Sequence, residues 1–249
     1  VAVAMRSPRF LPGGGLLYTG IDGHLWILQP GGGTTQVARN AHDGSPAPDG
    51  RTLVLTLVRE GIPHVYRIDP DGRSPVRLSH APARETAVAP DGSYALYVTA
   101  SDGRLWKVPL RGGPPVLLSR HPARYPAISP DGRLVAAIEH ERDGEPGPRV
   151  RIMAADGGDE RILELPRGAA ASQSGFRFSP DGTAIDYAQT DEAGVGNLWR
   201  RPLDGGPDVQ ITRFAAEPLT GFDWSPDGRT LACLRGGWHG DAYLVRGDW

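Results

Sequence analysis

Ser129-Pro130-Asp131-Gly132 is one of five closely related tetrapeptides that divide the sequence at regular intervals. The other copies, Ser or Ala followed by Pro-Asp-Gly, lie at 47–50, 89–92, 179–182 and 225–228, and a degenerate Leu-Pro-Gly-Gly occupies 11–14. The repeat prolines at 12, 48, 90, 130, 180 and 226 are 36, 42, 40, 50 and 46 residues apart, so the mean period is 214/5, about 43 residues. A period of this size is typical of the blades of a β-propeller.

The repeat around Pro90 shows what one period contains. Three short β-prone runs, at 94–99, 105–108 and 116–118, are separated by turns rich in Asp and Gly, and a further run precedes Pro90. Four strands joined by tight turns form one antiparallel blade. Six such periods use essentially all 249 residues. The sequence therefore predicts an all-β fold: a six-bladed β-propeller of four-stranded antiparallel blades, with residues 1–249 as a single domain.

The two ends of the chain complement each other. The last repeat stops at 245–249 without a fourth strand, whereas a spare strand-like run, Val1-Ala-Val-Ala-Met5, precedes the first repeat. A closed ring leaves no sheet edge unpaired at the seam. We therefore expect residues 1–6 to form the outer strand of the last blade and to close the propeller.

The amino-acid composition limits the kinds of partner that the protein is expected to bind. Lys and Arg number 27 and Asp and Glu 29, and the net charge of −2 argues against charge-driven nucleic-acid binding. No apolar stretch approaches the roughly 18 residues of a membrane span. The single Cys233 lies in an apolar run and is expected to be a small buried side chain. Because paired Cys, metal and phosphate motifs are all missing, we expect no cofactor, no metal site and a monomer.

Several copies of the repeat share more than the tetrapeptide. Ser129-Pro-Asp-Gly-Arg, Phe178-Ser-Pro-Asp-Gly and Trp224-Ser-Pro-Asp-Gly-Arg are each followed by an apolar strand, and Asp-Gly-Gly turns recur at 156–158 and 204–206. This pattern resembles TolB-like propeller repeats over essentially the entire chain. The resemblance implies a non-catalytic scaffold that binds a protein or peptide partner, and a periplasmic or extracellular location.

The alternation of strand direction separates two faces. The Pro-Asp-Gly and Gly-Gly turns fall on one face, and the loops that lead into each innermost strand fall on the other. The second face varies in sequence, so a site is expected there, around the central channel. Five residues before the repeat prolines lie Ser7, Asp43, Glu85, Tyr125, Gly175 and Gly221. Three residues before them lie Arg9, Ser45, Ala87, Ala127, Arg177 and Asp223.

In the second set one acid is flanked by an arginine in each neighbouring blade, since blades six and one adjoin. We expect Asp223 to pair with Arg177 or Arg9, either as a salt bridge between blades or as part of an anion site. The candidate binding residues around the channel mouth are Asp43, Glu85, Arg124, Tyr125, Arg177, Asp223 and, on the loop 236–240, Trp238.

The same face leaves an enzymatic alternative open. His42, His80 and His121 fall in corresponding loops of three successive blades, although their offsets from the repeat prolines differ. With Asp43 and Glu85 they would suit a small hydrolase or lyase at the channel mouth, with or without a divalent ion. No local catalytic motif selects this alternative, so no catalytic residue is assigned. A third alternative is an excised or engineered propeller without present activity.

Overall fold

The structure, a computed structural model, describes residues 5–139, 147–169, 175–236 and 241–247. Blade 1 comprises β1 (Met5–Phe10), β2 (Leu16–Gly20), β3 (Leu25–Leu28) and β4 (Thr34–Ala38), and blade 2 comprises β5 (Ala41–Pro46), β6 (Leu53–Arg59), β7 (Ile62–Ile68) and β8 (Val76–Arg77). Blade 3 comprises β9 (Ala83–Val88), β10 (Tyr94–Thr99), β11 (Leu105–Pro109) and β12 (Val116–Ser119), and blade 4 comprises β13 (Ala123–Ile128), β14 (Leu134–Glu139), β15 (Arg149–Ala154) and β16 (Arg161–Glu164). Blade 5 comprises β17 (Phe176–Phe178), β18 (Ala184–Thr190), β19 (Gly196–Pro202) and β20 (Val209–Gln210), and blade 6 comprises β21 (Leu219–Trp224), β22 (Thr230–Arg235) and β23 (Asp241–Arg246).

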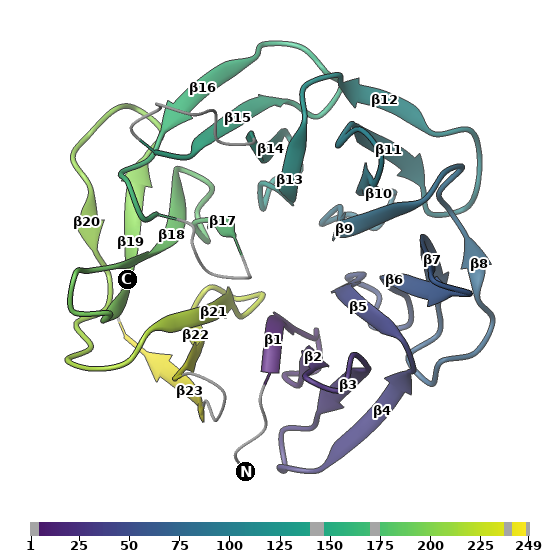
Figure 1. Cartoon of the computed structure of the whole chain (residues 1–249), viewed down its shortest axis with the longest axis horizontal. Helices are drawn as coiled ribbons and strands as arrows, with labels where there is room; N and C mark the ends of the chain where they lie inside the picture. Colours follow the sequence, from purple (N-terminus) through teal and green to yellow (C-terminus); the bar gives the residue numbers. More distant parts are fainter. Residues whose placement is uncertain (1–4, 140–146, 170–174, 237–240, 248–249) are drawn as a thin grey trace.

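The six sheets are arranged as a ring around a central channel (Figure 1). Within each blade the strands pair in chain order and antiparallel, and the first strand of each blade lies nearest the centre (Figure 1). Blades 1 to 5 have four strands each, and blade 6 has three within the described residues. The predicted all-β, six-bladed propeller is confirmed.

The repeated tetrapeptide is a turn that satisfies its own polar groups. Ser129 Oγ donates to Asp131 Oδ1 at 2.6 Å, and the same oxygen accepts the backbone N–H of Arg133 at 3.0 Å. The hydrogen bond from Ser129 lowers the pKa of the Asp131 carboxyl. Gly132 takes a φ of 72°, where a side chain would be strained. The polar atoms of the motif are therefore used within the turn, as expected of a structural element.

The turns of consecutive blades lie against one another. A Cβ added to Gly92 would lie 3.5 Å from Pro48, one on Gly132 would lie 3.8 Å from Pro90, and one on Gly182 would lie 3.5 Å from Pro130. The glycine of each of these turns therefore contacts the proline of the preceding one. This series places the turns on a single face of the ring, which we call the turn face.

The core is divided into clusters that join consecutive blades. The cluster between blades 4 and 5 includes Val150, Ile152, Phe176 and Tyr187, all of them buried. Aromatic side chains of the third strands contribute to these clusters in three blades, where Tyr66, Trp106 and Trp199 pack into or against them. Cys233 is fully buried between blades 5 and 6, and burial raises the pKa of its thiol to about 12.

The interface between blades 6 and 1, here called the seam, has the smallest of these clusters. Its buried members among the described residues are Phe10, Leu16 and Ala232. Apolar burial stabilises in proportion to the area removed from water, so over the described residues this interface gains less from apolar burial than the other five do.

The first strand begins earlier than predicted. Met5 and Arg6 pair with Gly20 and Thr19 and are part of β1 in blade 1, not of an outer strand of blade 6. Pairing with Met5 and Arg6 satisfies the edge of β2 that faces away from β3 as far as Gly20. Residues 1–4 lie outside the described residues, so closure of blade 6 by an N-terminal strand stays a prediction.

Candidate functional site

The innermost strands carry a repeated irregularity at the channel. The register of pairing shifts between Arg6 and Arg9 in β1 and at the corresponding places in β5, β9 and β13, whereas β21 shifts between Leu219 and Gly221. The residues five before the repeat prolines have left-handed φ values in five blades: Ser7 48°, Asp43 54°, Glu85 56°, Tyr125 51° and Gly175 64°. In blades 1 to 4 this residue lies within the register shift and forms a β-bulge, a feature that re-aims a side chain and recurs next to functional sites. In blade 5, Gly175 has the same φ, but β17 and β18 pair without a shift. We call the five left-handed residues the bulge ring.

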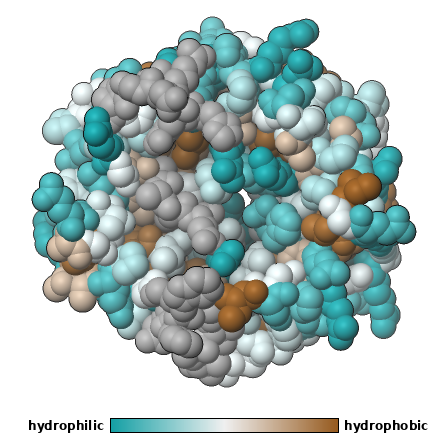
Figure 2. Space-filling model, in the orientation of Figure 1, coloured by the Kyte–Doolittle hydropathy of each residue, from teal (hydrophilic) through white to brown (hydrophobic). Residues whose placement is uncertain are grey.

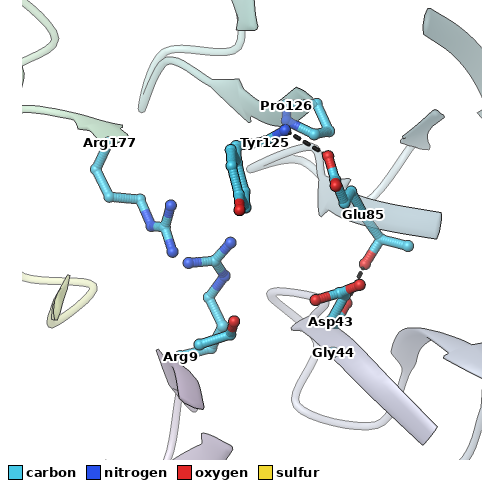
Figure 3. Close-up of a pocket in the computed structure, with 9 residues that line it drawn as sticks. Arg9, Asp43, Gly44, Glu85, Tyr125, Pro126 and Arg177 are labelled. Carbon is cyan, nitrogen blue, oxygen red and sulfur yellow. Dashed lines mark hydrogen bonds between the residues drawn. The ribbon is translucent and has the colours of Figure 1, made fainter. Parts of the chain in front are cut away.

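Four residues of the bulge ring, Ser7, Asp43, Glu85 and Tyr125, line the mouth of the channel. The mouth is a cavity bordered by Ser7, Arg9, Asp43, Gly44, Glu85, Thr86, Tyr125, Pro126 and Arg177 (Figure 3). A deeper cavity shares Arg9, Pro126 and Arg177 with it and continues between Ser45, Ala87 and Asp223 toward Pro130 of a turn-face motif. Figure 2 shows the corresponding hollow at the centre of the molecule, bordered in part by hydrophilic residues. The sequence-based placement of a site at the channel mouth therefore corresponds to a real cavity.

Glu85 is the most buried acid of the mouth, with 6% of its side chain exposed. It accepts hydrogen bonds from Arg124 Nε at 3.0 Å and from the backbone N–H of Tyr125 at 2.6 Å. The Arg124 guanidinium also lies over the Tyr125 ring, 4.9 Å from its centroid. Three of the predicted site residues thus form one rigid unit that joins blades 3 and 4.

Asp43 lies on the neighbouring bulge, in blade 2. Its Oδ2 is 2.8 Å from His42 Nδ1, and this hydrogen bond raises the pKa of His42. The backbone carbonyl of Asp43 accepts a hydrogen bond from Thr86 Oγ1 at 2.6 Å, which fixes the bulge against blade 3. Figure 3 shows Asp43 and Glu85 on the same side of the mouth.

Asp223 lies deeper in the channel, between the two predicted arginines. Its Oδ1 is 3.2 Å from Arg177 Nε and 3.7 Å from Arg9 Nη1. Its Oδ2 accepts the backbone N–H of Phe10 at 2.8 Å. Burial raises the pKa of Asp223 to about 6. The expected pairing of Asp223 with Arg177 or Arg9 is confirmed with both partners.

The three candidate histidines do not converge. His80 Nδ1 is 2.8 Å from the hydroxyl of Tyr97, and its ring lies edge-on to Trp106 at 4.5 Å. His121 is an exposed residue whose backbone N–H donates to Ser119 Oγ. Only His42 contacts a residue of the bulge ring. Within the described part of the chain no group of three or more His, Cys, Asp or Glu could hold a metal ion.

Trp238 lies outside the described residues, so its role stays a prediction. Arg151, on the third strand of blade 4, forms ion pairs with Glu139 and Glu160. Over the described ranges, no helix is long and apolar enough to cross a membrane.

No family model and no curated protein matches the sequence. Among solved structures, a putative TolB from Agrobacterium tumefaciens has a TM-score of 0.69 and 22% identity, over 86% of this chain and 80% of that one. The structural neighbours include TolB-like β-propellers. TolB from Acinetobacter baumannii gives a TM-score of 0.66 and 20% identity over 96% of this chain, which spans 56% of the TolB chain. An oligogalacturonate lyase in complex with manganese has a TM-score of 0.66 and 16% identity, over 98% of this chain and 75% of that one.

Proposed function

We propose that this propeller is a non-catalytic binding module that takes a protein or peptide partner at the channel mouth. The observation that carries the proposal is the bulge ring, which places four polar side chains from four blades around one cavity: the carboxylates of Asp43 and Glu85, the hydroxyl of Ser7 and the phenol of Tyr125. A left-handed φ at a residue with a side chain is unfavourable and persists where the surrounding structure enforces it. Its recurrence around a single opening favours a functional arrangement.

The hydrogen bonding of the mouth supports binding over proton transfer. Glu85 is held by Arg124 and by a backbone N–H, so its oxygens are fixed as acceptors. Such fixed groups are preorganised, and a preorganised surface loses little conformational entropy when it binds. The TolB-like architecture of the structural neighbours agrees with a binding role.

Selection from a displayed library of random peptides, against the immobilised full chain, tests the proposal. The affinity of the selected peptides is then measured by calorimetry for the unaltered chain and for Asp43→Asn. This variant changes the mouth, and Asn tolerates the left-handed φ at this position. We expect binding to weaken about tenfold. The matched control is Asp91→Asn, the same chemical change at an exposed residue of the turn face, which we expect to bind as the unaltered chain does. Peptides that bind both variants equally well would place the partner elsewhere.

A small hydrolase or lyase is the second candidate, and the His42–Asp43 pair is the observation that favours it. An imidazole hydrogen-bonded to a carboxylate is oriented as general bases often are. Because one structural neighbour is an oligogalacturonate lyase, an acidic oligosaccharide is the first substrate to try. If the full chain forms an unsaturated product from this substrate and His42→Gln does not, the result supports this candidate. If the full chain shows no turnover with or without added Mn²⁺, the result counts against it.

A further inference from the structure

Two arginines from different blades meet in the channel. Arg9 comes from β1 and Arg177 from β17, and they flank Asp223 of β21. Figure 3 shows the two guanidinium groups pointing toward one another below the ring of Tyr125. Both line the mouth and the deeper cavity, so they lie where the two spaces join.

One carboxylate lies between the two arginines. Asp223 contacts both guanidinium groups. Asp43 also attracts Arg9 electrostatically, while its carboxylate is hydrogen-bonded to His42. A buried cation is stable only where acceptors and opposite charge surround it, so the contacts of Arg9 decide what this point can hold.

Arg9 also has an orphaned donor. Its Nη1 is buried and has no hydrogen-bond acceptor among the described residues, and its nearest anionic oxygen is 3.7 Å away on Asp223. A buried donor without an acceptor carries an unfavourable desolvation cost, which a ligand oxygen placed against it would offset. Arginine has only donors, so the missing group is an acceptor and, given the charge, an anion.

From this geometry we infer that Arg9 and Arg177 hold a carboxylate of the bound partner at the inner end of the channel mouth. This inference rests on the proposed function and names the chemistry that the partner presents. The planar, forked guanidinium group matches a carboxylate in shape.

The acids at the rim of the mouth favour a peptide over an acidic oligosaccharide as the partner that carries this carboxylate. Asp43 and Glu85 border the mouth on the side opposite the two arginines (Figure 3). Their carboxylates favour a positive charge next to the carboxylate of the ligand, which a peptide with Lys or Arg beside Asp or Glu supplies and an acidic oligosaccharide does not. The partner expected is thus a peptide in which Asp or Glu neighbours Lys or Arg.

A capped peptide, acetyl-Gly-Glu-Lys-Gly-amide, provides the probe because its glutamate is its only carboxylate. Its Gln counterpart removes the charge and keeps the size. With the full chain labelled with ¹⁵N, we expect the side-chain Nε–H signals of Arg9 and Arg177 to shift and saturate with the Glu peptide, and binding of the Gln peptide to be about tenfold weaker or undetectable. Equal shifts with both peptides, or none with either, would overturn the inference.

Arg177→Lys separates recognition from folding. Lysine keeps the charge beside Asp223 but loses the fork, so the variant is expected to melt near the unaltered chain and to bind the Glu peptide about tenfold more weakly. The control is Arg161→Gln, since Arg161 is exposed on the outer β16 and should leave binding unchanged. If galacturonate shifts and saturates the Arg9 and Arg177 signals at a lower concentration than the Glu peptide does, the inference that the carboxylate comes from a peptide is refuted.

The two proposals fail in different ways. If library peptides bind at the mouth but neither Arg177→Lys nor an acid-to-amide change in the peptide weakens them, the carboxylate inference is refuted and the binding module stands. If selected peptides ignore Asp43→Asn, the proposed function itself is refuted.

Discussion

Asp223 and Phe10 are 213 residues apart in the sequence, and the carboxylate of the first accepts the backbone N–H of the second at 2.8 Å. This hydrogen bond joins the last blade to the first beside the channel. Arg9 adds an ion pair to the same carboxylate. These polar contacts lie at the seam, whose apolar cluster is small within the described part of the chain, and they help to hold the ring closed there.

The seam is therefore expected to open before the other interfaces. Phe10→Ala should cost about 3 kcal/mol, as large-to-small changes in a core do. The control is Phe176→Ala, which removes an equally buried ring from the interface of blades 4 and 5. Under mildly denaturing conditions, only Phe10→Ala should accelerate amide hydrogen exchange selectively in β1, β21 and β22. A uniform increase in both variants would contradict the idea of a weak seam.

Asp223 should give the stability of the protein an unusual pH dependence. Its pKa is raised to about 6 in the fold, whereas an unfolded Asp titrates at about 4. Between these values the folded chain binds more protons than the unfolded chain, so the contribution of Asp223 is present at low pH and is lost as the pH rises through about 6. Denaturant unfolding at several pH values measures it.

The variant Asp223→Asn isolates this group, because it cannot titrate. The stability of the unaltered chain relative to Asp223→Asn should fall by on the order of 2 kcal/mol between about pH 4 and pH 7. The turn carboxyls such as Asp131 have lowered pKa values and act in the opposite sense, but both proteins share them, so they cancel in the difference. A difference that is flat across this range would show that Asp223 has an ordinary pKa.

The bulge ring predicts a marked asymmetry at Ser7, whose φ is 48°. Ser7→Gly and Ser7→Val both remove the hydroxyl, but only Gly adopts this φ without strain, whereas a β-branched residue is strongly disfavoured there. Ser7→Val should be less stable than Ser7→Gly by about 1–2 kcal/mol, measured by urea unfolding. Equal stabilities would mean that the backbone at this position is an ordinary strand in solution.

Glu85→Gln tests whether this acid is structural. The amide oxygen still accepts the N–H of Tyr125, but the charge that faces Arg124 and Arg84 is gone. We expect a loss of about 2 kcal/mol, since removing one partner of a buried pair leaves the other uncompensated. Glu192→Gln, at an exposed residue, should change stability by less than about 0.5 kcal/mol. If the two variants unfold alike, Glu85 is free for another role.

The architecture was predictable because each repeat carries its own turn chemistry. Pro130, Asp131 and Gly132 fix a tight turn without help from distant residues, and the spacing of such turns counts the blades. Counting back along an alternating strand also located Asp223 between Arg9 and Arg177. Local rules sufficed wherever the strand alternation is regular.

The bulges and the histidines show where such rules stop. A bulge depends on how two strands pair. Its only trace in the sequence is the glycine at positions 175 and 221, which, like Asp43, lie five residues before a repeat proline. His42, His80 and His121 share a loop position, but the side chain of His80 turns to Tyr97 and that of His42 to Asp43. Side-chain direction in loops depends on neighbours that the sequence does not place.

The thin seam also bears on how the molecule assembles. Every other interface joins segments that are adjacent in the chain, so each new blade can dock onto the one just formed at a modest loss of chain entropy. Joining Phe10 to Ala232 instead requires segments of the first and last blades to find each other. Closure of the ring is thus the step of longest range and is expected to be the slow step of folding, which a covalent tether between blades 1 and 6 would accelerate.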